Sequence, residues 1–275
     1  MRNRGSKMRI GILGCGAIGS GIAQSVPNQL KHHYQLTALH DIEHLKAKNL
    51  EKKLHCRGLV KSSLSELITH CDLMVEAVNA STTKPMIQEA LKAKRHVLSM
   101  SVGKLLNSQG LLNLAQSLQV CLLIPSGAIA GVDALKAASL SAIQHITLTT
   151  RKPPLSFLHT PFVQKKKIHL SAIKSDTVLF EGDVASAVQL FPQNINVAVT
   201  LALSCHHPEI ITVRIIASPG IKNNIHEIEI IGDFGRIMTR TDNTVCPDNP
   251  KTSYLAVLSG IQTLKQFAEY VKIGT

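Results

Sequence analysis

Three glycines near the start of the chain have a spacing that can bind a phosphate group. Gly14, Gly16 and Gly19 form the pattern G-x-G-x-x-G within "GILGCGAIGSGIA", and Asp41 follows after about the 20 residues usual in dinucleotide-binding units. In such units the first glycine allows a tight turn, the second lets a pyrophosphate approach the backbone, and the third lets a helix pack closely. A carboxylate at Asp41 would accept hydrogen bonds from ribose hydroxyls and repel a 2′-phosphate, which predicts NAD in preference to NADP.

A histidine in the second half of the chain has the chemistry for proton transfer at physiological pH. His226 lies in an alternating stretch with Asn224 and Ile228 on its face of the predicted strand. A lone histidine in a strand can equally be a packing residue, so both interpretations remain open on the pattern alone.

Two asparagines, Asn194 and Asn196, follow Pro192 at the predicted start of a helix. Asparagine caps helices without any further function. The alternative is contact with the nicotinamide end of a cofactor, and the pattern does not decide between them.

The elements that must position the glycine motif alternate between strand and helix. Apolar runs predict five buried strands, at 8–13, 34–41, 72–78, 95–100 and 120–125. Helical patterns lie between them, and "SLSE" from Ser63 to Glu66 fits a capping box. The motif lies between the first strand and a helix, so the fold class predicted is α/β, a Rossmann-type doubly wound parallel sheet.

The second half of the chain has a different pattern of apolar and polar residues, which predicts an α+β domain with an open, mostly antiparallel sheet. Its alternating strands are expected at 145–152, 211–218 and 224–232, and 179–204 reads as a turn followed by two helices. A final helical segment is expected to return to the first domain. We therefore predict a dinucleotide-binding domain over 1–121 and 244–275 and a substrate and oligomerisation domain over 122–243.

The composition of the chain argues against nucleic-acid binding, a metal site and a membrane span. The net charge is +12, yet tryptophan is absent and aromatic residues make up 3%, which argues against a stacking platform for nucleic acid. Six scattered cysteines without a C-x-x-C pair argue against disulfides and a zinc site, so no metal is expected. No apolar run is long enough for a membrane span, and a cytoplasmic protein is predicted. The open sheet face at 211–232 predicts a homodimer or larger symmetric oligomer.

Together these motifs resemble the L-aspartate dehydrogenase family. The resemblance covers nearly all of the chain, in the order "GCGAIGSGIA", "SVGKL", "IPSGAIAGVDAL", "TTRKPP", "FEGDVASAVQLFPQNINVAVTLAL", "NIHEIEI" and "NPKTSYLAVLS". It implies NAD(P)-dependent oxidation of L-aspartate to iminoaspartate, which hydrolyses to oxaloacetate and ammonia. In some organisms iminoaspartate feeds NAD biosynthesis.

The resemblance also implies roles for individual residues. His226 matches the active-site histidine. An alanine of "SGAIAG" and an asparagine of "PQNINVA" match cofactor contacts, and the full set of expected cofactor-binding residues is Gly14, Gly16, Ala17, Ile18, Gly19, Asp41, Ala128, Ala130, Asn194 and Asn196.

The substrate's two carboxylates need cationic or N–H partners, for which Arg151, Lys152 and Asn224 are candidates. One departure is visible. Where the family often has Asp-Pro before the histidine strand, this chain has Ser218-Pro219, so a group that could orient the histidine is missing.

Two other functions are consistent with part of the pattern. A related oxidoreductase acting on another amino acid or a semialdehyde would keep the glycine motif with a different pocket. A non-catalytic NAD-sensing protein would keep the motif and have no need of His226.

Overall fold

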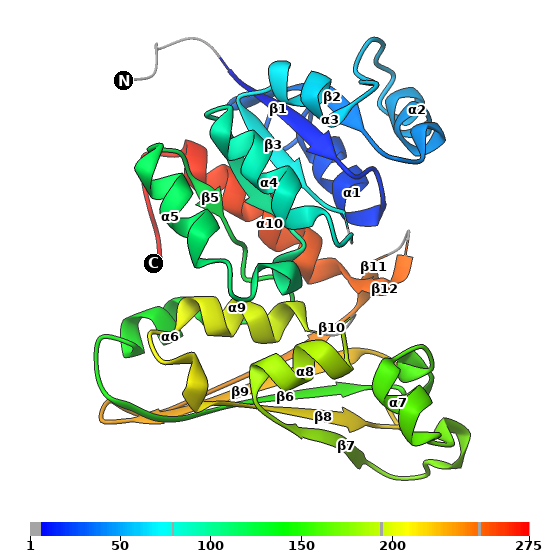
Figure 1. Ribbon diagram of the computed structural model, residues 1–275, viewed down its shortest axis with the longest axis vertical. Helices are drawn as coiled ribbons and strands as arrows, with labels where there is room; N and C mark the ends of the chain where they lie inside the picture. Colours follow the sequence, from blue (N-terminus) through cyan, green and yellow to red (C-terminus); the bar gives the residue numbers. More distant parts are fainter. Residues whose placement is uncertain (1–6, 79, 193–194, 247–248, 275) are drawn as a thin grey trace. The chain divides into compact units, whose positions relative to one another are not determined.

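The computed structural model describes residues 7–78, 80–192, 195–246 and 249–274, which form two compact units (Figure 1). The first unit contains the residues up to Pro125 and Val257–Val271, and the second contains Ser126–Ala256 and the residues from Lys272 onward. Residues 244–256 thus belong with the second unit, whereas the return to the first was predicted from 244. No helix within the described ranges has the length and apolar character to cross a membrane.

The first unit contains the parallel sheet that the apolar runs predict. Its strands are β1 (Met8–Leu13), β2 (Tyr34–His40), β3 (Leu73–Glu76), β4 (His96–Ser99) and β5 (Leu122–Leu123). They lie in the order β2-β1-β3-β4-β5, and every neighbouring pair is parallel. Side chains such as Ile12, Val75 and Leu98 are fully buried, as expected for a sheet with both faces covered.

Helices connect these strands. They are α1 (Ala17–Ser25), α2 (His44–Lys53), α3 (Leu64–Thr69), α4 (Thr83–Lys92), the 3₁₀ turn η1 (Val102–Leu105) and α5 (Gln109–Ser117). At α3 the Ser63 hydroxyl accepts from the Glu66 N–H at 3.1 Å, as the capping box predicts. The Glu66 carboxylate accepts instead from the Ser62 N–H and hydroxyl, so only half of the box forms.

The long helix α10 (Tyr254–Ala268) belongs to the first unit from Val257 onward. Glycines permit close contact at two places. A Cβ on Gly21 of α1 would lie 2.7 Å from Cγ1 of Val257, and one on Gly260 would lie 2.8 Å from Sδ of Met100. The Tyr34 hydroxyl donates to the Leu264 carbonyl at 2.8 Å, which ties β2 to the same helix.

The second unit contains a mixed sheet in the order β10-β9-β6-β8-β7. The strands are β6 (Ile143–Lys152), β7 (Thr177–Gly182), β8 (Ile211–Ala217), β9 (Asn224–Gly232) and β10 (Gly235–Asn243). Only β6 and β8 are parallel, so the expectation of a mostly antiparallel sheet holds. Strands β7 and β10 were not predicted, and both lie at the edges of the sheet.

Helices lie along one face of this sheet (Figure 1). They are α6 (Val132–Ala138), α7 (Pro161–Lys166), α8 (Val184–Leu190) and α9 (Asn196–Ser204). Short 3₁₀ turns are η2 (Pro154–Phe157), η3 (Leu170–Ala172) and η4 (Pro208–Ile210), and a ribbon of β11 (Val245–Cys246) and β12 (Asn249–Ser253) precedes α10.

The two faces of the second sheet differ in character. Side chains toward the helices are buried and mostly apolar, among them Leu148, Val213 and Ile228. The other face carries ion pairs between strands, for which Arg214–Glu181 at 2.9 Å and Arg240–Glu227 at 2.7 Å are examples. The sheet thus has one covered face and one open face, as the alternating pattern predicts.

Candidate active site

The glycine motif folds as a tight turn between β1 and α1. Gly14 has φ +92°, and a Cβ there would lie 2.6 Å from the Ala77 carbonyl oxygen. A Cβ on Gly19 would overlap the Gly14 carbonyl oxygen, so α1 can pack on the loop only with glycine at this position. Gly14 and Gly19 therefore have the roles that the motif predicts for its first and third glycines.

Gly16 differs from the other two because a Cβ there would meet nothing within 4 Å. It is the N-cap of α1, and the first turn of that helix contains no acidic residue. The open space beside Gly16 therefore adjoins the partly positive end of a helix that begins with Ala17 and Ile18, a setting that favours an anion. These residues fit the pyrophosphate of a dinucleotide.

Asp41 lies directly after β2, beside the glycine loop. Its Oδ2 accepts from the Cys15 N–H at 2.7 Å, and its Oδ1 accepts from the Glu43 N–H at 2.8 Å. A carboxylate has about four acceptor positions. Asp41 can therefore hold the loop and still accept hydrogen bonds from a ribose.

A buried carboxyl group at the end of β3 was not predicted. Glu76 has no exposed surface, and it accepts from the Ser99 hydroxyl at 2.7 Å and the Val78 N–H at 2.9 Å. Burial raises its pKa above the usual value. Glu76 joins the carboxyl ends of β3 and β4, the edge at which doubly wound sheets bind ligands. Its signal in the sequence is a single acidic residue within the apolar run "LMVEAV".

His226 lies on the covered face of the second sheet. Its neighbours across the strands are Thr150 on β6 and Thr241 on β10. The ring is 5% exposed, and its Nδ1 lies 3.0 Å from Oγ1 of Thr150. Burial, followed by the positive charge of Lys152, lowers the pKa of His226 to about 3. Without a ligand the imidazole is therefore neutral at physiological pH.

The two predicted cations of β6 point to opposite faces, as successive strand residues do. Lys152 shares the face of Thr150 and His226, and desolvation lowers its pKa to about 8. Arg151 lies on the open face, where it pairs with Glu227 at 3.0 Å and Asp176 at 2.6 Å. The structure therefore brings Lys152 to the histidine and does not bring Arg151 there.

The remaining predicted residues of the second unit that the structure describes lie on β9, in the loop before α6 and at the start of α9. Asn224 shares the face of His226 on β9. Ala128 and Ala130 lie in the loop before α6, and their carbonyls accept hydrogen bonds from β10. Asn196 begins α9, and its carbonyl accepts from the Thr200 hydroxyl at 3.0 Å. Asn194 lies outside the described residues.

Ser218, where the resemblance led us to expect an aspartate, follows β8. Its N–H donates to the Lys152 carbonyl at 2.9 Å, and its buried hydroxyl has no partner among the residues described. The side chain that holds Nδ1 of His226 is Thr150, which sequence reasoning missed. The only local signal for Thr150 is its place in the alternating stretch "HITLTTRK".

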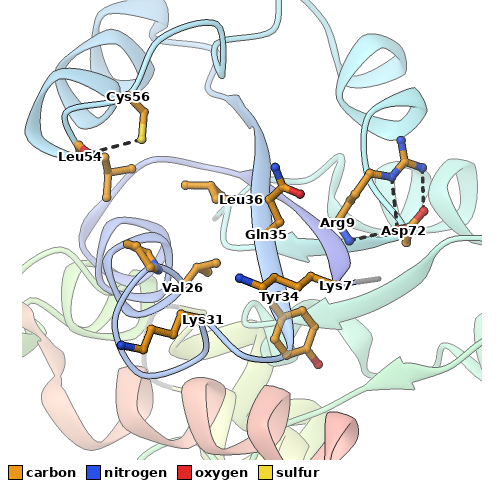
Figure 2. Close-up of a pocket in the computed structure, with 11 residues that line it drawn as sticks. Lys7, Arg9, Val26, Lys31, Tyr34, Gln35, Leu36, Leu54, Cys56 and Asp72 are labelled. Carbon is orange, nitrogen blue, oxygen red and sulfur yellow. Dashed lines mark hydrogen bonds and ion pairs between the residues drawn. The ribbon is translucent and has the colours of Figure 1, made fainter. Parts of the chain in front are cut away.

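A hollow of about 940 Å³ lies at the amino ends of β1 and β2 (Figure 2). Lys7, Lys31 and Leu36 line it, together with Arg9, which pairs with Asp72 at 2.7 Å. Gly14 and Asp41 follow the carboxyl ends of the same strands. This hollow is therefore at the edge of the sheet opposite the glycine loop and is separate from the candidate cofactor site.

Comparison with known proteins connects both units to dehydrogenases. The family described as "Homoserine dehydrogenase, NAD binding domain" matches residues 14–125, and "Aspartate dehydrogenase, C-terminal" matches residues 133–267. The L-aspartate dehydrogenase of Methanosarcina mazei is 40% identical over 271 residues, covering 98% of this chain and 100% of the relative. That of Methanothermobacter thermautotrophicus is 38% identical over 276 residues, covering 98% and 99%.

Solved structures agree on the fold. An aspartate dehydrogenase from Thermotoga maritima has a TM-score of 0.74 at 22% identity and covers 98% of this chain and 100% of its own. A putative homoserine dehydrogenase from Archaeoglobus fulgidus has a TM-score of 0.59 at 15% identity, covering 94% and 99%.

Proposed function

This chain belongs to the L-aspartate dehydrogenase family, and on that premise we propose that it catalyses the NAD(P)-dependent oxidative deamination of L-aspartate. The products are iminoaspartate and then, by hydrolysis, oxaloacetate and ammonia. When bound, the pyridine nucleotide supplies the hydride acceptor for the substrate's Cα–H. The observation that carries the proposal is a neutral, buried histidine beside a lysine on one sheet face, in a chain that also contains a dinucleotide loop.

The first unit binds the cofactor in this proposal. Gly16, Ala17 and Ile18 receive the pyrophosphate, and Asp41 accepts from the adenosine ribose hydroxyls. Because a 2′-phosphate would meet the Asp41 carboxylate, we propose NAD as the preferred cofactor. Ala128, Ala130, Asn194 and Asn196 are the proposed contacts contributed by the second unit.

His226 manages the protons of the reaction. Its neutral ring can accept a proton from the substrate's ammonium group, release that proton to solvent, and later accept one from the water that attacks the imine. Nδ1 is held by Thr150, so we assign proton transfer to Nε2. The low pKa of the ligand-free histidine rises when an anionic substrate approaches, because an opposite charge favours the protonated ring.

Lys152 and Asn224 are the proposed partners of the substrate carboxylates. A lysine whose pKa is about 8 remains largely protonated at physiological pH and can pair with a carboxylate. A carboxylate paired with Lys152 also offsets the positive charge by which Lys152 lowers the pKa of His226. Substrate binding and the readiness of the histidine to accept a proton are therefore linked.

The assembly and location proposed are a homodimer, or larger symmetric oligomer, in the cytoplasm. Met238 and Val178 lie on the open face of the second sheet with 67% and 52% of their surface exposed, which supports association through that face. The six cysteines are free thiols, four of them buried, which fits a reducing compartment. Light scattering at micromolar concentration should give at least a dimer, and a single monomeric species would contradict the assembly.

The proposed activity is tested by following NADH formation with a panel of amino acids. Signal with L-aspartate alone supports the proposal. Turnover of a different amino acid or a semialdehyde would instead identify a related oxidoreductase, and NAD binding without turnover would identify a sensing protein.

The cofactor preference needs its own comparison. We expect kcat/KM to favour NAD over NADP in the wild type and the preference to shrink in Asp41→Ala. Asp41→Asn keeps an acceptor for the Cys15 N–H and removes the charge, so it separates electrostatic repulsion from the positioning of the loop. Equal efficiency with both cofactors in the wild type would remove Asp41 from this role.

A further inference from the structure

Three side chains on β10 hold the loop that contains Ala128 and Ala130. The Thr241 hydroxyl donates to the Ala128 carbonyl at 2.9 Å, and Nδ2 of Asn243 donates to the same oxygen at 3.0 Å. The Thr239 hydroxyl donates to the Ala130 carbonyl at 3.1 Å. Alternate residues of a strand share one face, so these three donors form a row beneath the loop.

The chemistry of these contacts fixes the orientation of the Asn243 side chain. A carbonyl oxygen can only accept, so the group of Asn243 that faces Ala128 must be the amide N–H₂. The Thr241 hydroxyl gives its hydrogen to Ala128 and accepts from Nδ2 at 3.1 Å. Oδ1 of Asn243 is then left buried, with no partner among the described residues. Most buried side-chain acceptors in folded proteins have a partner, so Oδ1 of Asn243 is an exception to that tendency.

The same residues are in register with the histidine. Thr241 lies directly across from His226, and Asn243 lies directly across from Asn224. Each therefore contacts the loop with its side chain while its backbone pairs with the strand that carries His226. The loop can approach β10 this closely because its last residue is Gly131, where a Cβ would lie 2.8 Å from Cγ2 of Thr239.

We propose that Thr241 and Asn243 are positioning residues that set the loop of Ala128 and Ala130 at a fixed distance from His226. This rests on the proposed function, in which the loop contacts the cofactor and His226 handles the proton. A hydride acceptor and a proton acceptor must be held in register with one substrate, and displacements of about 1 Å at a distance from the chemistry can cost about a hundredfold in rate. The strand β10 links the two groups through side chains and backbone together.

The test uses substitutions that remove one donor without changing shape. Thr241→Val removes the hydroxyl, and Thr241→Ser restores it. Asn243→Asp keeps the shape and places an acceptor against the Ala128 carbonyl. Thr149→Val is the matched control, because Thr149 is a buried threonine on β6 that faces the other side of the same sheet.

We expect Thr241→Val and Asn243→Asp to weaken NAD binding by the free enzyme, measured by calorimetry, and to lower kcat/KM for L-aspartate by about tenfold or more. Thr149→Val should change neither, and Thr241→Ser should recover most of both. The midpoint of thermal unfolding should fall no further in Thr241→Val than in Thr149→Val.

Kinetics and NAD affinity in Thr241→Val that match those of Thr149→Val would overturn the proposal. The proposal would also be overturned if the losses of NAD affinity and of kcat/KM followed the decrease in melting temperature in the same way in every variant. Because NAD binding is measured apart from turnover, a wild type that binds NAD but does not oxidise L-aspartate would remove the proposed function. Weakened NAD binding in Thr241→Val would then still support the positioning of the loop.

Discussion

Nδ1 of His226 lies 3.0 Å from Oγ1 of Thr150, the residue directly across from it on β6. Both side chains are buried, with 5% and 1% of their surfaces exposed. A hydrogen bond to one ring nitrogen determines how the ring is oriented and which atom remains for the substrate. In this chain a hydroxyl from the neighbouring strand holds the ring, and the buried hydroxyl of Ser218 has no hydrogen-bond partner among the described residues.

Thr150→Val should lower kcat with L-aspartate while NAD affinity stays unchanged, because the ring loses its orientation and the cofactor loop is untouched. Thr150→Ser should retain most of the activity. Nitrogen NMR of the imidazole should show one preferred tautomer in the wild type and a mixture in Thr150→Val. Unchanged spectra and kinetics would show that the hydrogen bond does not orient the ring.

His226→Ala should lower kcat by about 10²–10⁴-fold, the usual contribution of a general acid or base. Its NAD affinity should change by less than about tenfold, since the glycine loop belongs to the other unit. Asn196→Ala should show the opposite result, with a larger loss of NAD affinity than of kcat. The exposed His206→Ala is the matched control. Near-wild-type kcat in His226→Ala would make the histidine a packing residue.

The buried histidine predicts a stability that depends on pH. The pKa of His226 falls from 6.5 to about 3 on folding, so the unfolded chain binds the proton more readily. The contribution of the neutral His226 ring to the free energy of unfolding is fully present above pH 6.5 and is lost as the pH falls toward 3. The slope attributable to one such group is at most about 1.4 kcal/mol per pH unit. Denaturant unfolding at several pH values should show this slope in the wild type and a smaller one in His226→Gln. Equal slopes would contradict the assignment.

Lys152 predicts a change in ligand affinity above about pH 8, where its ammonium loses its proton. The cation is present below that pH and absent above it, so a C4 dicarboxylate inhibitor without an amino group should bind less tightly as the pH rises. Lys152→Arg should move the transition to higher pH, and Lys152→Met should weaken binding throughout. Inhibition constants without a transition in the wild type would exclude Lys152 as a carboxylate partner.

Several elements could be predicted from the sequence because their local pattern is strong. β1 and β9 have the predicted bounds, since one is a buried apolar run and the other alternates clearly between apolar and polar residues. β10 has no such signal. It is an edge strand whose residues are mostly exposed or half-buried, with Arg236 and Arg240 among them, so burial imposes little hydrophobic pattern on it.

The site was predicted only as far as single residues carry information. His226 and Lys152 could be proposed from residue type, but the contact of His226 with Thr150 depends on the pairing of β6 with β9, which is not encoded locally. Arg151 shows the same limit at closer range. It precedes Lys152 by one residue, and a shift of one residue in a strand changes the face of the sheet.

The closure of α10 on the first unit has a consequence for how the protein is made. The chain leaves that unit at Pro125 and comes back at Val257, so the whole sheet of the second unit is synthesised in between. At about 5–20 residues per second, the ribosome needs roughly 7 to 26 seconds to pass from one point to the other. During that interval the surfaces around Gly21 and Met100 have no helix to pack against, because α10 has not yet been synthesised. The five strands of the second sheet are therefore synthesised before the part of α10 that completes the first unit.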